Sequence, residues 1–164
     1  MSLHAGRLCE VLGLLALANY APILLKQVAG PRWAWPVDGG VTLWDGRPLL
    51  GTSKTWRGLA GSVAATTAGA LAMGMGWGVG AAVAGWSMGG DLFSSFCKRR
   101  LGMNSGGRAT GLDQIPEALF PALAACGMLG LGWLDVAVVV VVFLVGEMGL
   151  WVLFFKWHLR ERPY

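Results

Sequence analysis

The sequence predicts an all-α integral membrane protein, a bundle of about five transmembrane helices with two polar cytoplasmic loops. Hydrophobic residues make up 55% of the 164 residues and charged residues only 13%, about half of the ~25% that is usual in soluble domains. Mean hydropathy is +0.56, and the apolar residues gather in blocks long enough for spans of about 20 residues. The three cysteines have no C-x-x-C spacing, so neither a zinc site nor a disulfide scaffold is indicated.

The first apolar block predicts a span over residues 11–30. Its apolar run continues through Ile23–Leu25, so we expect a retained helix and not a cleaved signal peptide. The next block, residues 58–97, has no basic side chain and a single acid, Asp91. Its length is that of two spans, 58–75 and 77–97, which divide in the glycine-rich turn near Gly74–Gly78.

The last apolar block divides near residues 132–135 into spans 115–132 and 135–156, with Asp135 as the expected N-cap of the final helix. In lipid, its run of valines favours a helix. Glycines at small-xxx-small spacing in the second and third helices predict close helix packing. We therefore expect one membrane domain over residues 1–164.

Basic residues set the expected orientation. Of 13 Lys and Arg side chains, Arg7 alone lies before the first span. The others flank or lie in the loop after the first helix, in the loop after the third, or after the fifth: Lys26, Arg32, Arg47, Lys54, Arg57, Lys98, Arg99, Arg100, Arg108, Lys156, Arg160 and Arg162. This distribution predicts an N-terminus outside the cell membrane and cytoplasmic loops and C-terminus.

Polar residues inside a span are costly and are therefore candidates for function. Ser94, Ser95 and Lys98 follow Asp91 at i+3, i+4 and i+7, which places all four on one helical face. A carboxylate, hydroxyls and a cation in that arrangement suit a metal ion and phosphate oxygens. The alternative is an internal Asp91–Lys98 ion pair that seals the bundle.

The two cytoplasmic loops combine glycines, basic residues and isolated aspartates, a pattern that suits a phosphate group and its divalent ion. Ordinary binding of anionic lipid head groups is the other interpretation. Gly46 and Gly51 have P-loop spacing, but Lys54 comes two residues late and no strand precedes it, which excludes a Walker A loop. Glu147, in the middle of the last helix, has a structural or a substrate-lining role, and Glu117 suits the positive end of its helix.

Several linked motifs resemble the CDP-archaeol synthase family, which is related to the CDP-diacylglycerol synthases. They are Asn19-Tyr-Ala-Pro22, Asp45-Gly-Arg-Pro48, Gly51-x-x-Lys-Thr-Trp-Arg-Gly58, Gly90-Asp-Leu-x-x-Ser-Phe-x-Lys-Arg-Arg-Leu-Gly102 and Leu112-Asp-Gln114. The resemblance implies transfer of CMP from CTP to a lipid phosphate monoester, with Mg²⁺, giving a CDP-lipid and pyrophosphate. The implied partners are CTP, the lipid acceptor and membrane lipids, with no nucleic acid; a homodimer is a further expectation.

The matched motifs also imply residue roles. Asp91 and Asp113 would hold Mg²⁺, while Lys54 and Arg57 would bind the triphosphate of CTP. A third group would contact the lipid phosphate or pyrophosphate: Lys98, Arg99 and Arg100, with Ser94 or Ser95 orienting an oxygen. Asp91, Asp113, Lys98 and Arg99 are the expected catalytic residues. Further substrate contacts are expected from the other motif positions: Asn19, Asp45, Arg47 and Thr55.

One departure from the archaeal pattern concerns the metal ligands. A second aspartate closely follows the Leu-Asp-Gln element in that pattern, whereas Ile115-Pro116-Glu117 follows it here. Either Glu117 replaces that carboxylate or the site has one acidic ligand fewer. The acceptor is then an archaeal digeranylgeranylglyceryl phosphate, phosphatidic acid or another isoprenoid phosphate. A lipid-binding assembly protein and a transporter of a phosphorylated compound are the two competing function classes.

Overall fold

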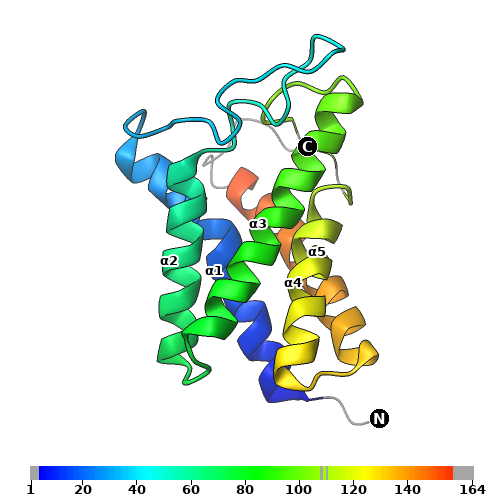
Figure 1. Ribbon diagram of the computed structural model, residues 1–164. Coiled ribbons are helices and arrows are strands. Elements are labelled where there is room, and N and C mark those ends of the chain that lie inside the picture. Colours follow the sequence, from blue (N-terminus) through cyan, green and yellow to red (C-terminus); the bar gives the residue numbers. More distant parts are fainter. Residues whose placement is uncertain (1–3, 108, 110, 157–164) are drawn as a thin grey trace.

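The computed structural model describes residues 4–107, 109 and 111–156, the last seven of these by their backbone alone. Over these residues the fold is all-helical, without a regular strand (Figure 1). The five helices are α1 (Ala5–Ala29), α2 (Trp56–Ala72), α3 (Trp77–Arg100), α4 (Gln114–Leu129) and α5 (Trp133–Lys156). Each apolar block of the sequence therefore forms the helix or helix pair that its length predicted.

Two helices extend further than their apolar blocks. α1 begins at Ala5 and not at residue 11, and an Arg7–Glu10 ion pair at i,i+3 spacing lies in its first turns. α3 continues to Arg100, because a helix C-terminus favours the basic side chains of its last turn. α4 ends earlier than expected, where Gly130 takes a left-handed φ of 65° and donates its N–H to the Cys126 carbonyl.

The predicted N-cap role of Asp135 is wrong. α5 already begins at Trp133, which places Asp135 in its first turn. From there the carboxylate Oδ2 reaches back and accepts the Gly132 N–H at 2.9 Å, and Oδ1 accepts the His4 N–H at 3.2 Å. From inside the helix, Asp135 therefore accepts a hydrogen bond from the backbone N–H that precedes α5, as the acidic partner of a capping box does. It also ties α5 to the start of α1.

α3 lies at the centre of the bundle and contacts α1, α2 and α4, while α5 packs against α4 and α1. Small residues make two of these crossings possible. A Cβ at Gly80 would lie 2.6 Å from the Thr67 Cα, and one at Gly90 would lie 2.3 Å from the Pro116 carbonyl oxygen. The close packing predicted for the regularly spaced glycines is confirmed at Gly80 but is wrong for Gly85 and Gly89, whose Cβ positions meet no atom within 4 Å. Gly90 was not part of that predicted pattern.

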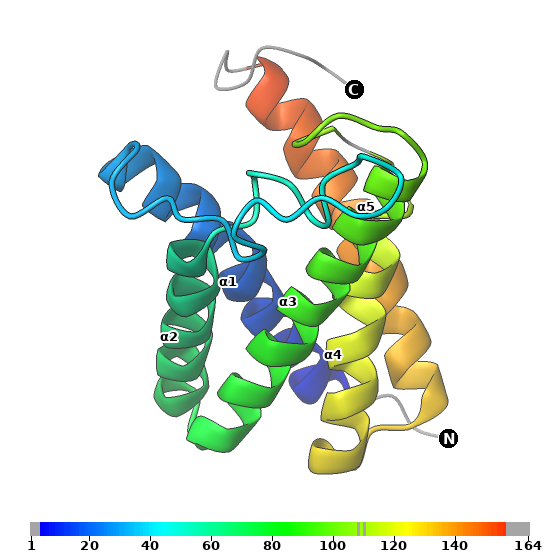
Figure 2. The same cartoon turned by 45° about the horizontal axis from the view of Figure 1, so that its top comes forward.

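Both long connections, residues 30–55 and the described part of residues 101–113, lie at the same end of the bundle, and α5 ends there too (Figures 1 and 2). The short turns and the start of α1 lie at the opposite end. Many large apolar side chains face outward from the helices, among them Leu24, Trp86, Phe93, Val141 and Val145. Among the described residues, α1 is the one helix that combines enough length and apolar content to cross a membrane.

Candidate functional site

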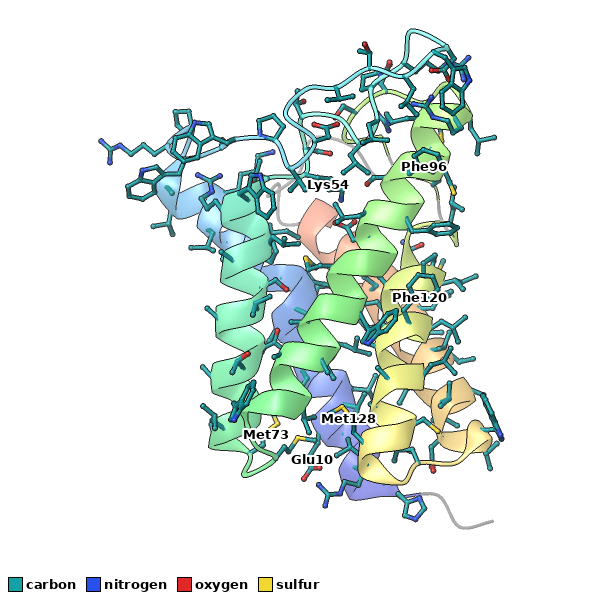
Figure 3. The ribbon with its side chains drawn as sticks, in the orientation of Figure 1. Glu10, Lys54, Met73, Phe96, Phe120 and Met128 are labelled. Atoms are coloured by element: carbon teal, nitrogen blue, oxygen red, sulfur yellow. The ribbon has the colours of Figure 1, made fainter. Side chains whose placement is uncertain are left out.

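A cavity of about 640 Å³ opens at the loop end of the bundle, and all five helices contribute to its lining. Lys54, at the end of the first loop, points into this region from above the helices (Figure 3). Its charged lining is balanced between four basic and four acidic side chains: Lys26, Lys54, Arg57 and Lys98, with Asp91, Asp113, Glu117 and Glu147. The loops and the helix bundle thus meet at one polar site.

The acidic and basic residues pair across the sequence. Lys54 Nζ contacts both carboxylate oxygens of Asp91, at 2.5 and 2.6 Å. Lys98 Nζ lies 2.6 Å from Asp113 Oδ1 and donates to the Gly107 carbonyl at 2.9 Å. The predicted alternative, an internal Asp91–Lys98 pair, is therefore wrong, because each partner is engaged by a residue from a loop.

Helical periodicity explains which residues of the predicted polar face reach the cavity. Asp91 and Lys98 are seven residues apart, so their directions differ by only about 20° around α3, and both line the cavity. Ser94 and Ser95 lie further around the helix, are buried, and are absent from the lining. Ser94 Oγ donates to the Asp91 carbonyl at 2.9 Å, so it acts on the helix backbone near the site.

A third carboxyl group lies against Asp91. Glu117, in the first turn of α4, is only 8% exposed, and its carboxyl group lies near that of Asp91. The α3–α4 crossing at Gly90 brings the two together, since it places the Glu117 backbone directly against α3. Glu147 of α5 lines the same cavity, which agrees with the substrate-lining alternative stated for it.

The first loop is held by an aspartate that the sequence reasoning did not select. Asp38 Oδ2 accepts the Leu50 and Gly51 N–H groups at 2.8 and 3.0 Å, and Oδ1 accepts the Gly40 N–H at 3.0 Å. Partial burial raises the pKa of Asp38, but the backbone hydrogen bonds outweigh it and leave that pKa below the usual 3.8. An Asp followed by two glycines was the available signal for such a turn.

Three further predicted contacts belong to the cavity wall and also hold the helices in place. Thr55 Oγ1 accepts the Gly58 N–H at 3.2 Å and so caps the N-terminus of α2. Asn19 Nδ2 donates to Ser87 Oγ at 3.2 Å, which joins α1 to α3. Arg57 Nη1 donates to the carbonyl of Gly30, at 2.9 Å, and also to the carbonyl of Arg32.

Four other predicted residues lie outside the lining of the large cavity and cluster at the C-terminal end of α3: Asp45, Arg47, Arg99 and Arg100. Arg100 Nη1 contacts both Asp45 carboxylate oxygens at 2.6 Å. Arg47 Nη1 donates to the Arg100 carbonyl at 2.5 Å. These contacts fasten the first loop to α3, a role that the motif positions alone did not reveal.

Comparisons with known proteins identify the family. The family described as CarS-like, CDP-archaeol synthase, matches residues 12–79. A CDP-archaeol synthase of Aeropyrum pernix is 42% identical over 123 residues, which cover 71% of this chain and 67% of that protein. The chain belongs to the CDP-archaeol synthase family. The CDP-archaeol synthase of Hyperthermus butylicus is 41% identical over 110 residues, but these span only 59% of that relative's length.

A solved structure extends the family likeness to the fold. It is described as an intramembrane enzyme for archaeal membrane lipids biosynthesis, and it matches with a TM-score of 0.64 and 35% identity. The match covers 83% of this chain and 89% of that one. The predicted family, the all-helical fold and a membrane location are thereby confirmed. That all five helices cross the bilayer, the sidedness of the termini and the individual site residues stay predictions.

Proposed function

We propose that this chain is a CTP-dependent cytidylyltransferase, which transfers CMP to a lipid phosphate monoester and releases pyrophosphate. The observation that carries the proposal is the cavity where Lys54–Asp91 and Lys98–Asp113 face one another at the loop end of a membrane bundle. Its volume is in the range of small-ligand sites. Since the relatives are CDP-archaeol synthases, the proposed acceptor is an archaeal digeranylgeranylglyceryl phosphate.

The lysines are the proposed phosphate ligands. Each is held near a carboxylate in the cavity, so an arriving triphosphate can replace that carboxylate as the partner of the ammonium group. Lys54, with Arg57 beside it in the lining, would take the nucleotide, and Lys98 the lipid phosphate or the departing pyrophosphate. The exchange leaves Asp91 and Asp113 available to a cation.

The oxygen-rich lining suits Mg²⁺, although the described residues contain no cluster of three or more His, Cys, Asp or Glu side chains placed to hold a metal by themselves. Mg²⁺ is commonly bound through one or two carboxylates together with substrate phosphates and water. Asp91 and its neighbour Glu117 offer such a pair, with Asp113 on the same cavity. When bound, the ion would neutralise charge on the phosphates.

The reaction itself demands positioning more than proton transfer. An oxygen of the ionised lipid phosphate attacks the α-phosphorus of CTP, and the bond from that phosphorus to the bridging oxygen breaks. The electron pair leaves with pyrophosphate. Because the nucleophile is already an anion, no general base is needed, and the lysines contribute by aligning the two phosphates and stabilising charge on the leaving group.

The proposed membrane arrangement has five spanning helices, with the N-terminus outside and the loops and C-terminus in the cytoplasm. This follows the distribution of Lys and Arg, and it is supported by the position of both loops at one end of the bundle. The cavity then faces the compartment that supplies CTP, while the acceptor approaches from the bilayer. A homodimer stays a prediction.

The test is pyrophosphate release and CDP-lipid formation by the purified protein with CTP and Mg²⁺. Parallel reactions contain the digeranylgeranylglyceryl phosphate or phosphatidic acid. We expect turnover with the archaeal lipid, loss of turnover in Lys54→Met, and unchanged turnover in the control Arg7→Gln at the opposite end of the bundle. Inactivity with both acceptors beside a working control enzyme would contradict the proposal; transport across sealed vesicles without CTP would favour the transporter.

A further inference from the structure

A second, smaller cavity of about 190 Å³ lies at the C-terminal end of α3, between the two loops. Arg47 and Pro48 of the first loop, Arg99, and residues 102–105 of the second loop form its walls. Lys98 and Arg99 are consecutive, so their side chains leave α3 about 100° apart. Lys98 lines the large cavity and Arg99 the small one.

Arg99 is a buried cation without a close partner. Its residue is only 3% exposed. Within the described part of the chain, its guanidinium makes no hydrogen bond and no ion pair within 4 Å, and its Nε is fully buried. Asp113 attracts Arg99 from a longer distance, but its Oδ1 lies 2.6 Å from Lys98. A largely buried cation without a close partner is unfavourable, so the Arg99 guanidinium is available to an anion in this cavity.

The other walls are suited to the same kind of ligand. No acidic side chain is among the lining residues. Arg47 covers the carbonyls at the end of α3, donating to those of Arg99 and Arg100 at 3.5 and 2.5 Å, and so offsets the negative end of the helix dipole. Ser105 contributes a hydroxyl, held at 3.3 Å from the Ser53 N–H.

We propose that this cavity binds a phosphate-type oxyanion between the Arg99 guanidinium, Arg47 and the Ser105 hydroxyl. A planar guanidinium offers two parallel N–H groups to such an anion. The cavity is smaller than the ~300–1,000 Å³ of sites for drug-sized ligands, which suits one or two phosphate groups and not a nucleotide. The anion is either a free phosphate or diphosphate or the phosphate head of a membrane lipid. The site does not depend on the proposed reaction.

The primary test is the melting temperature of the full chain in a neutral detergent, titrated with inorganic phosphate and with pyrophosphate. A lipid arm compares nanodiscs of phosphatidylcholine alone with nanodiscs that also contain phosphatidic acid. All proteins carry Lys54→Met, so that binding in the large cavity is weakened. We expect one anion source to raise the melting temperature, and that source identifies the ligand.

Adding Arg99→Met to this background is expected to abolish the anion-dependent rise. It should also leave the anion-free melting temperature equal or higher, because it removes an unpaired buried charge. The matched control is Arg7→Met, an exposed arginine of α1, which should keep the full rise. An equal rise with and without Arg99, or no rise with any of the anions, would overturn the proposal.

A milder variant covers the case in which Arg99→Met fails to fold. Ser105→Ala removes one donor to the anion, which should weaken its apparent affinity about 10- to 150-fold, since a hydrogen bond to a charged group contributes roughly 1.5–3 kcal/mol. Isothermal titration with the anion source identified above measures this change. Unchanged affinity in Ser105→Ala would place the anion outside this cavity.

Discussion

The two ends of the bundle use carboxylate contacts for different purposes. At the loop end, Lys54–Asp91 and Lys98–Asp113 join segments far apart in the sequence and line an open cavity. At the opposite end, the Asp135 carboxylate accepts from the His4 N–H, the His4 ring and the Gly132 N–H, and is almost completely buried.

The difference lies in how fully each carboxylate is satisfied. Asp135 accepts its hydrogen bonds from backbone N–H groups and from the His4 side chain, so its contacts hold the start of α1 against the start of α5. Asp91 is held by a lysine on a loop, lies near a second carboxyl group, and still faces the cavity. Charged pairs that are accessible and exchangeable therefore mark the site, whereas saturated pairs mark the structural end.

The largest expected effect is on turnover at the loop end. Asp91→Asn keeps the shape of the side chain but removes its charge, which should lower turnover about 10²–10³-fold, the range for losing one group that stabilises charge in a transition state. Pyrophosphate release at several Mg²⁺ concentrations measures it. The matched control is Glu10→Gln in the exposed Arg7–Glu10 pair, which should keep wild-type turnover. Normal turnover of Asp91→Asn at low Mg²⁺ would contradict the metal assignment.

The next effect concerns the crossing that brings Asp91 to Glu117. Gly90→Ala would place a methyl group 2.3 Å from the Pro116 carbonyl oxygen and 2.8 Å from the Glu117 nitrogen. We expect a loss of about 1–3 kcal/mol of stability, as for other overpacked sites, measured by thermal unfolding in detergent.

The neighbouring glycine supplies the control for this crossing. Gly89→Ala meets no atom within 4 Å, so it should be neutral or raise stability by up to ~1 kcal/mol through better helix propensity. Equal effects of the two substitutions would show that the α3–α4 contact does not depend on Gly90.

A smaller effect is expected at the structural end. Asp135→Asn weakens the acceptor of two His4 donors and of the Gly132 N–H, so stability should fall by about 1–2 kcal/mol. Turnover per folded molecule should stay unchanged, since Asp135 is absent from the cavity lining. Parallel unfolding and pyrophosphate-release measurements check this, and a large loss of turnover at full folding would remove the distinction between the two ends.

The fold could be predicted from the sequence because lipid imposes one solution on long apolar blocks. The helix ends were predicted less well. Asp135 has the residue type of an N-cap, but the backbone reaches helical geometry two residues earlier and uses the same side chain from inside the helix. Short-range sequence patterns predict that a helix forms more reliably than they predict the residue at which it begins.

The candidate site was predictable where it depends on one helix. The spacing of Asp91 and Lys98 placed both on the cavity side of α3. Their partners were not predictable, because Lys54 and Asp113 arrive from separate loops whose paths depend on tertiary contacts. The motif implied similar roles for the adjacent basic residues Lys98 and Arg99. It therefore did not predict that their side chains line different cavities.

The smallest expected effect tests how the loop end is held. The pKa of Asp38 lies below its usual 3.8, because hydrogen bonds from Gly51, Gly40 and Leu50 outweigh the opposing effect of partial burial. The folded state therefore favours the charged carboxylate, and its stabilisation is complete above the unfolded pKa and lost as pH falls through the lower folded value. Asp38→Asn should reduce stability by about 1 kcal/mol at neutral pH.

The difference in melting temperature between wild type and Asp38→Asn should stay constant at neutral pH and shrink as the pH is lowered below 3.8. Taking the difference removes the titration of all other groups, so the remaining slope belongs to Asp38. Because Asp38 fixes the segment that leads to Lys54, the KM for CTP should rise in the variant while Asp135→Asn leaves it unchanged. A pH-independent difference would mean that the carboxylate charge contributes nothing to holding this loop.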